Sequence, residues 1–470
     1  MESRTTALMR AHCEQSYSKI LSDIEAREEM PFRARTPEIA TDIQAIRKSC
    51  LAARRRAAVR DTLLLLVYLY VFFFVAAPLA GRDGTELLED GLPIGPLVWT
   101  YAVAAGVCFA WRYVSRRQAR AALENAGLDD LALADLEGRP PEQTEVIISG
   151  GYSPFVGAGF ETEGWSFTVD VTEPADAGKP VGLLDIDSLY GETQANFTRL
   201  LSNDHVLTDT VFVDGRDVRN RPSLLPGGEF SQPARTIPTA EIHTLMKGND
   251  RELRHYKCLR SVLWGGQLAI SAYYRFAKRG EVLFSEVRIF VLPPLREEFR
   301  ACESLPKTPT LPDFFSMLTL SLIDPLWRWI AVFLSAFGWI GTSMQRLGAE
   351  RRRRKANKTL IEADRRYNYG WPSSLREGWS NGSTYERYFQ QVDQDFNVKM
   401  IKQALLTSLL ASLERRNIST ESFKGASSKI FNEGIIISGG SVTADSLTAG
   451  KQAKSKVNKR ATESQKPATV

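Results

Sequence analysis

Histidine and cysteine are scarce in this chain of 470 residues, and their spacing gives neither type a metal site. The chain contains His12, His205, His243 and His255, and its five cysteines are Cys13, Cys50, Cys108, Cys258 and Cys302. No two histidines stand at a metal-ligand spacing and no two cysteines form a CxxC pair, so we expect no metal and no cofactor. We interpret the scattered cysteines as reduced structural thiols of a cytoplasmic protein, without a disulfide framework.

A broad basic face and a catalytic constellation are also missing. The net charge is only +5, and the excess lies in the run Arg351 to Lys355 and in the carboxyl-terminal tail, so we expect no nucleic-acid partner. His205 stands close to Asp204 and Asp209 in the sequence, but without the spacing of a nucleophile and its base. We therefore name no catalytic residue and expect a protein that is not an enzyme.

Long apolar runs, by contrast, are present near the amino end, from Leu63 to Ala80 and from about Leu92 to Val114. Each run is close to the roughly 20 residues that a helix needs to cross about 30 Å of hydrocarbon, and the first charge in either run is Arg112. The sequence therefore predicts a transmembrane helical hairpin over residues 61–115. A buried hairpin in a soluble protein is the alternative, which we disfavour because core helices rarely stay apolar on every face.

The distribution of basic residues predicts the orientation of this hairpin. The loop between the two runs has Arg82 as its single basic residue against four acidic residues, whereas both flanks are strongly basic. We therefore expect the loop outside and both termini in the cytoplasm, in a multi-pass protein of a cell inner membrane. Residues 1–60 are expected to form cytoplasmic helices, the last of which starts at Thr36–Glu38 and runs into the membrane.

Arginines beside the apolar segments are candidates for contact with anionic lipid headgroups. The alternative is that these charges only set the topology. They are Arg54, Arg55, Arg56, Arg60, Arg116, Arg117, Arg351, Arg352, Arg353 and Arg354.

The sequence from about residue 140 to 305 predicts a cytoplasmic α+β domain. The expected elements are strands at 145–149, 165–171 and 205–214, a helix at 185–201, and strands at 256–264, 267–278 and 281–292. Gly265–Gly266 and Arg279–Gly280 separate the last three strands, and such short connections suit β-hairpins. These three strands therefore predict an antiparallel β-meander.

A glycine-rich loop follows the first expected strand, and its backbone amides could cradle an anion. The candidate ligand-binding residues are Gly150, Gly151, Tyr152, Ser153, Gly157 and Gly159. The loop matches neither the phosphate-binding P-loop nor the dinucleotide fingerprint, so we favour a structural turn over a ligand site.

A second apolar segment covers residues 312–346 and contains Asp324, Pro325 and Arg328. Asp324 and Arg328 are four residues apart on one helix face and can pair, while the remaining surface is apolar. We favour a helix that lies in the membrane interface or packs on the hairpin. The alternatives are a re-entrant or crossing segment and a buried core helix.

The carboxyl-terminal region is divided into a helical part at 356–418, a glycine-rich β-motif at 430–450 and a disordered tail at 451–470. From Tyr385 to Leu413 apolar residues recur every three or four positions, which predicts an amphipathic helix capped by Ser383 or Thr384. Its apolar stripe is a candidate surface for self-association, with docking on the body as the alternative. The residues of the stripe are Phe389, Val392, Phe396, Leu405 and Leu409.

Four sequence motifs carry a resemblance. They are Ser149–Gly159 (SGGYSPFVGAG), Tyr367–Gly370 (YNYG), Tyr388–Gln390 (YFQ) and Asn432–Gly440 (NEGIIISGG). This combination resembles a family of uncharacterised bacterial membrane proteins that carry an amino-terminal transmembrane hairpin, a cytoplasmic body and a glycine-rich end. The resemblance implies an architecture and no mechanism. The ending is similar to segments of otherwise different bacterial proteins of defence or signalling systems, which implies an interaction role.

The sequence leaves three functions open. We favour a non-enzymatic inner-membrane scaffold or sensor whose carboxyl-terminal region assembles copies or recruits a protein partner, with membrane lipid as a further partner. The alternative is a membrane-tethered domain that binds, and in one version hydrolyses, a small ligand or nucleotide at the glycine-rich loop. A transporter or pore is the weakest hypothesis, because two spans offer no polar pathway unless many copies assemble.

Overall fold

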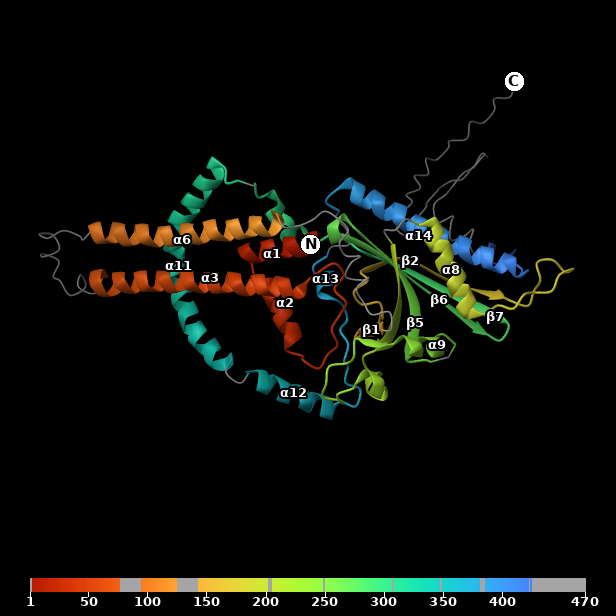
Figure 1. The fold of residues 1–470 in the computed structure, drawn as a ribbon. Helices are drawn as coiled ribbons and strands as arrows, with labels where there is room; N and C mark the ends of the chain where they lie inside the picture. Colours follow the sequence, from red (N-terminus) through yellow and green to blue (C-terminus); the bar gives the residue numbers. More distant parts are fainter. Residues whose placement is uncertain are drawn as a thin grey trace, which may run out of the picture. The chain divides into compact units, whose positions relative to one another are not determined.

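A computed structural model describes residues 2–76, 94–124, 143–201, 205–247, 250–306, 308–346, 349–380, 385–421 and 423–424 (Figure 1). The predicted β-motif at 430–450, the tail at 451–470 and the expected caps at 383 and 384 lie outside these residues.

The longer helices are α1 (Arg4–Gln15), α2 (Ser18–Glu28), α3 (Ile43–Val71, continued by the π-helical turn Phe72–Ala76), α6 (Ile94–Glu124), α8 (Ile186–Leu200), α9 (Thr239–Lys247), α11 (Leu311–Arg346), α12 (Ala349–Ala363) and α14 (Tyr388–Arg415). Two single-turn helices are α10 (Glu297–Arg300) and α13 (Leu375–Gly378). The strands are β1 (Gln143–Ser149), β2 (Phe160–Asp170), β3 (His205–Asp214), β4 (Thr236–Pro238), β5 (Leu253–Leu263), β6 (Leu268–Arg279) and β7 (Val282–Leu292).

The chain divides into two compact units. The first unit consists of Met1–Gly164, Leu200–Arg275 and Arg288–Ile401, and the second of Trp165–Arg199, Phe276–Val287 and Lys402–Val470. The amino-terminal helices therefore belong to the same unit as β1, β3 and β5.

The strands form a mixed sheet in the order β2-β7-β6-β5-β3-β1-β4, so the fold is α+β. The strands β5, β6 and β7 are neighbours both in sequence and in the sheet, as predicted, and β5 pairs antiparallel with β6 and with β3. The strand β1 pairs in parallel with β3, with Glu145 opposite Thr210. This pairing was not predicted, because a parallel pair depends on a long crossover and leaves no local turn signal.

The glycine-rich loop is anchored to the sheet by an aromatic side chain. Phe155 is 9% exposed, and its ring lies 4.8 Å from Phe212, 5.5 Å from Tyr256, 5.0 Å from Tyr273 and 4.8 Å from Phe290. Aromatic pairs at these separations stabilise a core beyond the area that they bury. The loop is therefore held in place by the core of the first unit.

The helices α3 and α6 lie side by side in opposite directions (Figure 1). Arg60 lies 4.1 Å from the ring of Trp111, and four residues further along α3 Leu64 packs in one cluster with Cys108. By length and apolar composition Ile43–Val75 and Ile94–Glu124 are the two described helices that could cross a membrane. They are the two helices in which the sequence predicts the hairpin.

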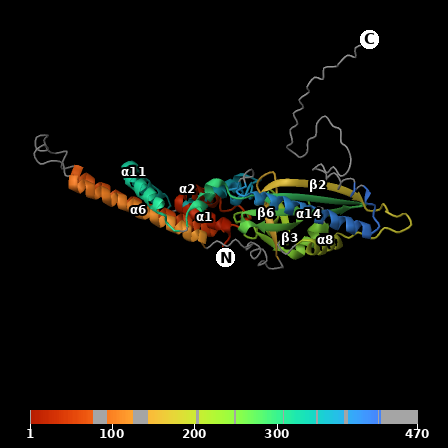
Figure 2. The ribbon, with the colours of Figure 1, turned by 90° about the horizontal axis from the view of Figure 1, so that it is seen from above.

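The third apolar helix, α11, crosses both members of this pair (Figure 1), and it still lies against α6 in the turned view of Figure 2. Asp324 of α11 forms an ion pair with Arg112 of α6 at 2.7 Å, and Arg328 lies 3.8 Å from Asp61 of α3. The predicted pairing of Asp324 with Arg328 is present at 4.0 Å. The polar side of α11 is thus turned to the hairpin.

Pro325 interrupts the hydrogen bonding of α11, because proline has no backbone N–H. The hydroxyl of Tyr68 donates a hydrogen bond to the carbonyl of Pro325 at 3.0 Å, and the hydroxyl of Tyr101 donates to the carbonyl of Leu322. Two tyrosines of the hairpin therefore bind backbone carbonyls next to the proline.

The expected helix start at Thr36–Glu38 was wrong. The helix α3 begins at Ile43, where the side chain of Asp42 accepts hydrogen bonds from the backbone N–H groups of Gln44 and Ala45 at 2.9 and 3.0 Å. The hydroxyl of Thr36 instead donates to Glu38 at 2.7 Å. Asp42 is the better cap, because its carboxylate lies at the positive end of the helix dipole.

The interpretation of all five cysteines as reduced thiols was also wrong. Cys13 of α1 and Cys50 of α3 form a disulfide, and both side chains are fully buried. The pairing has no spacing signature, because α1 and α3 bring together two residues that are 37 positions apart. Cys108, Cys258 and Cys302 are buried free thiols, as expected.

In the second unit, the end of α14 is joined to α8 by ion pairs. Arg416 contacts Glu192 at 2.7 Å, and Ser412 donates a hydrogen bond to the same carboxylate at 2.6 Å. The hydroxyl of Tyr190 on α8 accepts a hydrogen bond from the backbone N–H of Phe276 at 2.8 Å. Contacts of α8 with the end of α14 and with Phe276 therefore hold this unit together.

Candidate functional site

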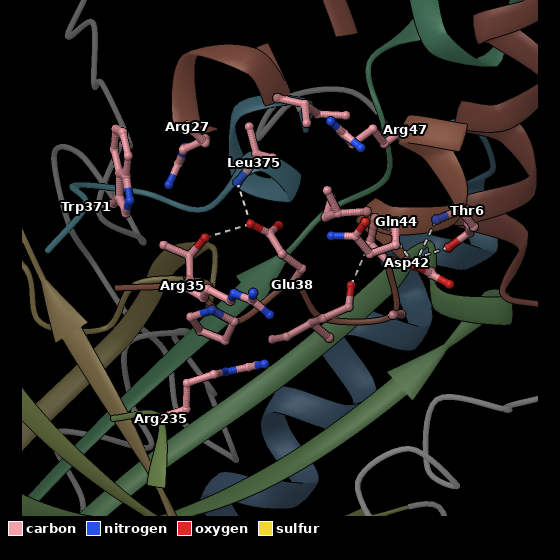
Figure 3. A pocket seen from close by; sticks show the side chains of 18 of the residues that line it. Thr6, Arg27, Arg35, Glu38, Asp42, Gln44, Arg47, Arg235, Trp371 and Leu375 are labelled. Atoms are coloured by element: carbon pink, nitrogen blue, oxygen red, sulfur yellow. Dashed lines mark hydrogen bonds between the residues drawn. The ribbon is translucent and has the colours of Figure 1, made fainter. Parts of the chain in front are cut away.

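A pocket of 1210 Å³ lies in the first unit between the amino-terminal segment and the sheet. Its walls come from the segment 24–47, from Glu145 of β1, from Arg260 of β5 and from Trp371 and Leu375 near α13. Figure 3 shows Glu38 near the middle of the pocket, with Arg27 and Trp371 on one side and Arg35 and Arg235 on another. The pocket was not predicted, because its amino-terminal wall meets residues of β1, of β5 and of the region near α13 only after folding.

Two guanidinium groups lie over one indole ring in this pocket. The guanidinium carbon of Arg27 is 4.2 Å and that of Arg33 is 4.7 Å from the centroid of Trp371. Arg27 also donates a hydrogen bond to the carbonyl of Ser373 at 2.6 Å. Burial lowers the pKa of Arg27, with Glu38 acting in the opposite direction.

Glu38 fixes one wall of the pocket to α13. Its carboxylate accepts hydrogen bonds from the backbone N–H groups of Leu375 and Arg376 at 3.0 and 2.9 Å. Burial raises the pKa of Glu38, and the hydrogen bonds from Leu375 and Thr36 oppose that shift. The carboxylate satisfies donors at the helix start that would otherwise need water.

The amides of the glycine-rich loop are occupied by a carboxylate of the chain itself. The backbone N–H groups of Gly157 and Gly159 donate to Oε1 of Glu377 at 2.9 and 2.8 Å, and Ser374 donates its N–H to the other oxygen at 2.6 Å. Burial raises the pKa of Glu377, against these hydrogen bonds. The amides of Gly157 and Gly159 are therefore used by Glu377 of the chain itself. A smaller hollow of 290 Å³ lies beside it.

The remaining candidates of the loop are separated from one another. Gly150 lies against the backbone of Gly370, where an added Cβ would stand 2.6 Å from the Gly370 carbonyl carbon. The side chain of Asn368 donates to the carbonyl of Gly150 at 3.0 Å, while Tyr152 is fully exposed. The motifs Ser149–Gly159 and Tyr367–Gly370 are thus packed against each other through their backbones at Gly150 and Gly370.

A fully buried arginine stands beside these loops. Arg376 donates hydrogen bonds to the carbonyls of Gln267 and Pro293 at 3.0 and 2.9 Å, and to the hydroxyl of Ser380. Burial lowers its pKa to about 9, although Glu38 raises it. This residue could not be predicted, because a single arginine in a short helix has no recognisable sequence pattern.

Several of the predicted membrane-surface arginines are paired within the protein. Arg54 contacts Glu25 at 3.0 Å, Arg56 contacts Glu14, and Arg60 contacts Asp61 at 2.7 Å. Arg116 lies 3.7 Å from Asp313, and Arg353 and Arg354 contact Glu29 and Glu350 at 3.3 and 2.8 Å. The side chains of Arg55, Arg117, Arg351 and Arg352 are exposed.

The predicted self-association stripe is divided between exposed and buried residues. Phe389, Val392 and Phe396 are 66%, 39% and 60% exposed, whereas Leu405 and Leu409 are buried. Only the amino-terminal turns of α14 therefore present the stripe to a partner.

Asp209 of β3 is close to His205 in the sequence, but in the structure it pairs with residues of the neighbouring strand β5. Asp209 contacts His255 of β5 at 2.7 Å and Lys257 at 3.0 Å. Burial lowers the pKa of His255, which opposes the effect of Asp209. Within the described ranges, three or more His, Cys, Asp or Glu side chains do not gather in any group that could hold a metal ion.

Comparison with protein families finds a match to the AbeC-like domain over residues 164–443. Comparison with curated proteins and with solved structures finds no match. The matched region contains the motifs at 367–370, 388–390 and 432–440, whereas the glycine-rich loop at 149–159 and the hairpin precede it. Because the match covers more than half of the chain, this protein belongs to the family with an AbeC-like domain.

Proposed function

We propose that this protein is a non-enzymatic sensor or scaffold that is anchored in the inner membrane of a bacterium. One observation carries the proposal. The helix α3 lines the pocket of 1210 Å³ with Ile43, Gln44 and Arg47, and the same helix continues into a candidate membrane span. A ligand in the pocket would therefore contact the helix that holds the protein to the lipid. In this role the hairpin is an anchor, and lipid is one partner.

The surface of the three long helices supports the anchor. Large apolar side chains are exposed on α3, α6 and α11, and exposed apolar surface on a helix is typical of a site that contacts a membrane or a partner. Among them are Leu66 of α3, Phe73 and Phe74 of the π-helical turn that continues it, Val98 and Trp99 of α6, and Phe315, Leu326, Trp327 and Ile330 of α11. The polar side of α11 faces the hairpin through Asp324 and Arg328, so its apolar side is free for the bilayer surface.

Reporter fusions test the topology of the anchor. Alkaline phosphatase is active only outside the cytoplasm and green fluorescent protein fluoresces inside it, so each is fused after residues 85, 308 and 360. We expect phosphatase activity at 85 and fluorescence at 308 and 360, with both termini inside. Opposite sides for 308 and 360 would mean that α11 crosses the membrane, and fluorescence at 85 would overturn the orientation.

Assembly of copies is the second part of the role, and the exposed turns of α14 favour it. Phe389, Val392 and Phe396 form an apolar surface that a second copy can cover. We expect the full-length protein in detergent to be oligomeric by light scattering, and the variant F389S/V392S/F396S to be smaller. The variant Leu360→Ser, at an exposed leucine of α12, serves as the control. A monomeric wild-type protein would exclude self-association through α14.

A further inference from the structure

The pocket has an excess of unpaired positive charge. Seven arginines and five carboxylates line it. The carboxylates are already engaged: Glu2 by Arg10, Glu28 by Arg47, Glu38 by backbone N–H groups, Asp42 by the start of α3, and Glu145 by the charge of Arg260. Four arginines form no ion pair with a carboxylate within the described ranges, namely Arg27, Arg33, Arg35 and Arg235. Of these, Arg27 still feels the charge of Glu38, Glu377 and Asp23 from a distance.

These four arginines differ in how their donors are used. Arg35 and Arg235 are exposed, and their side chains have neither a hydrogen bond nor an ion pair with any described residue. Nη1 of Arg27 and Nε of Arg33 are buried and have no hydrogen-bond partner in the described part of the chain. A buried charged donor without an acceptor costs free energy. An anion that enters the pocket would supply acceptors to these donors and remove that cost.

The distance from the bilayer separates a soluble anion from a lipid headgroup. The pocket contacts α3 around Ala45, and the apolar run of the same helix begins at Leu63. At 1.5 Å per residue, these two points are about 27 Å apart along the helix. A lipid with its tails in the membrane cannot place its phosphate in the pocket.

We propose that this pocket binds a soluble phosphate compound of about nucleotide size with at least two negative charges. Guanidinium groups bind phosphate oxygens through two parallel hydrogen bonds, and Arg27 and Arg33 are held in place by Trp371. A volume of 1210 Å³ is larger than a single phosphate needs and is sufficient for a nucleotide. This inference names the ligand of the sensor proposed above and rests on that proposal.

Calorimetry of the full-length protein in neutral detergent tests the inference with two probes, ADP and inorganic pyrophosphate. We expect ADP to bind with a Kd below about 1 mM, and the variant R35A/R235A to bind it at least about tenfold more weakly. The control variant R365A/R366A removes the same charge at two exposed arginines outside the pocket and should bind as the wild type does. The melting temperature of R35A/R235A should stay unchanged, because neither side chain has a partner to lose.

Three outcomes would overturn the inference. They are no heat of binding with either probe, equal binding by R35A/R235A and the wild type, and binding of micelles that contain phosphatidylglycerol without binding of a soluble probe. The last result would assign the arginines to lipid. The assay uses no membrane, so its failure leaves the anchor to be judged by the reporter fusions.

Discussion

The carboxylate of Glu38 accepts a hydrogen bond at 3.0 Å from the backbone N–H of Leu375, which lies 337 residues further along the chain. This contact joins the pocket wall that precedes α3 to the start of α13. The same short helix carries Glu377, which holds the glycine-rich loop. One helical turn thus contacts the pocket wall before α3 through Leu375 and the glycine-rich loop through Glu377.

Replacing Glu38 by glutamine should change how stability depends on pH. Burial raises the pKa of Glu38 above its ordinary value of 4.5, so the folded chain holds this proton more tightly than the unfolded chain does. The stability that Glu38 contributes is therefore complete below pH 4.5 and falls as the pH rises through the raised pKa. We compare the melting temperature of the wild type with that of Glu38→Gln at each pH. We expect the wild type to gain on the variant at pH 5, so that the difference between the two melting temperatures is larger in its favour there than at pH 8. Equal differences at both pH values would contradict this account, and Glu281→Gln, at an exposed position, is the control.

Replacing Gly370 by alanine should destabilise the first unit strongly. An added Cβ would stand 2.2 Å from the carbonyl carbon and oxygen of Ser149, so the two backbones must separate. We expect a loss of about 2–4 kcal/mol in the free energy of unfolding. The control is Gly191→Ala on α8, where nothing lies within 4 Å of the added atom and alanine should gain up to about 1 kcal/mol. Equal denaturation curves for Gly370→Ala and the wild type would exclude the packing described above.

Removing the carboxylate of Asp324 should loosen α11 from the hairpin. Arg112 contacts Asp324 at 2.7 Å and would be left half-buried without its partner. We expect Asp324→Ala to cost about 1–3 kcal/mol in detergent, and the exchanged pair R112D/D324R to recover part of it. Glu350→Ala, whose ion pair with Arg354 is exposed on α12, should cost less. The same melting temperature for both single variants would argue against the ion pair.

The bridge between Cys13 and Cys50 should stabilise the amino-terminal helices. A crosslink between residues 37 positions apart lowers the entropy of the unfolded chain, which adds about 3–4 kcal/mol to the free energy of unfolding. We expect dithiothreitol to lower the melting temperature of the wild type and to leave that of C13S/C50S unchanged. The redox state in cells also tests the orientation, because cytoplasmic thiols are kept reduced. A bridge trapped by alkylation of intact cells would argue against a cytoplasmic amino terminus.

Much of the fold could be predicted where the signal is local. The turns at Gly265–Gly266 and Arg279–Gly280 lie between strands that alternate in polarity, so β5, β6 and β7 followed from the sequence. The apolar runs gave α3 and α6 for the same reason. The start of α3 was misplaced because Thr36–Glu38 satisfies the local rules for a helix cap, and only tertiary contacts show that Asp42 takes that role.

The candidate site could not be predicted, because its parts meet only after folding. The sequence favours a structural turn for the glycine-rich loop, but it does not show that the turn is held by Glu377, which is 220 residues from Gly157. The unpaired character of Arg35 and Arg235 depends on which carboxylates the other arginines engage, and single-sequence patterns do not carry that information. The disulfide likewise depends on how α1 packs against α3.

The most direct test of the central claim, that the chain is anchored in a membrane, is alkaline carbonate extraction of membranes from cells that express the full-length protein. Carbonate at pH 11 releases proteins that are held to a membrane only by charge. The account predicts that the protein stays in the membrane pellet, because α3 and α6 are embedded in lipid. Complete release into the supernatant would contradict it and would make the exposed helices a protein-binding surface instead.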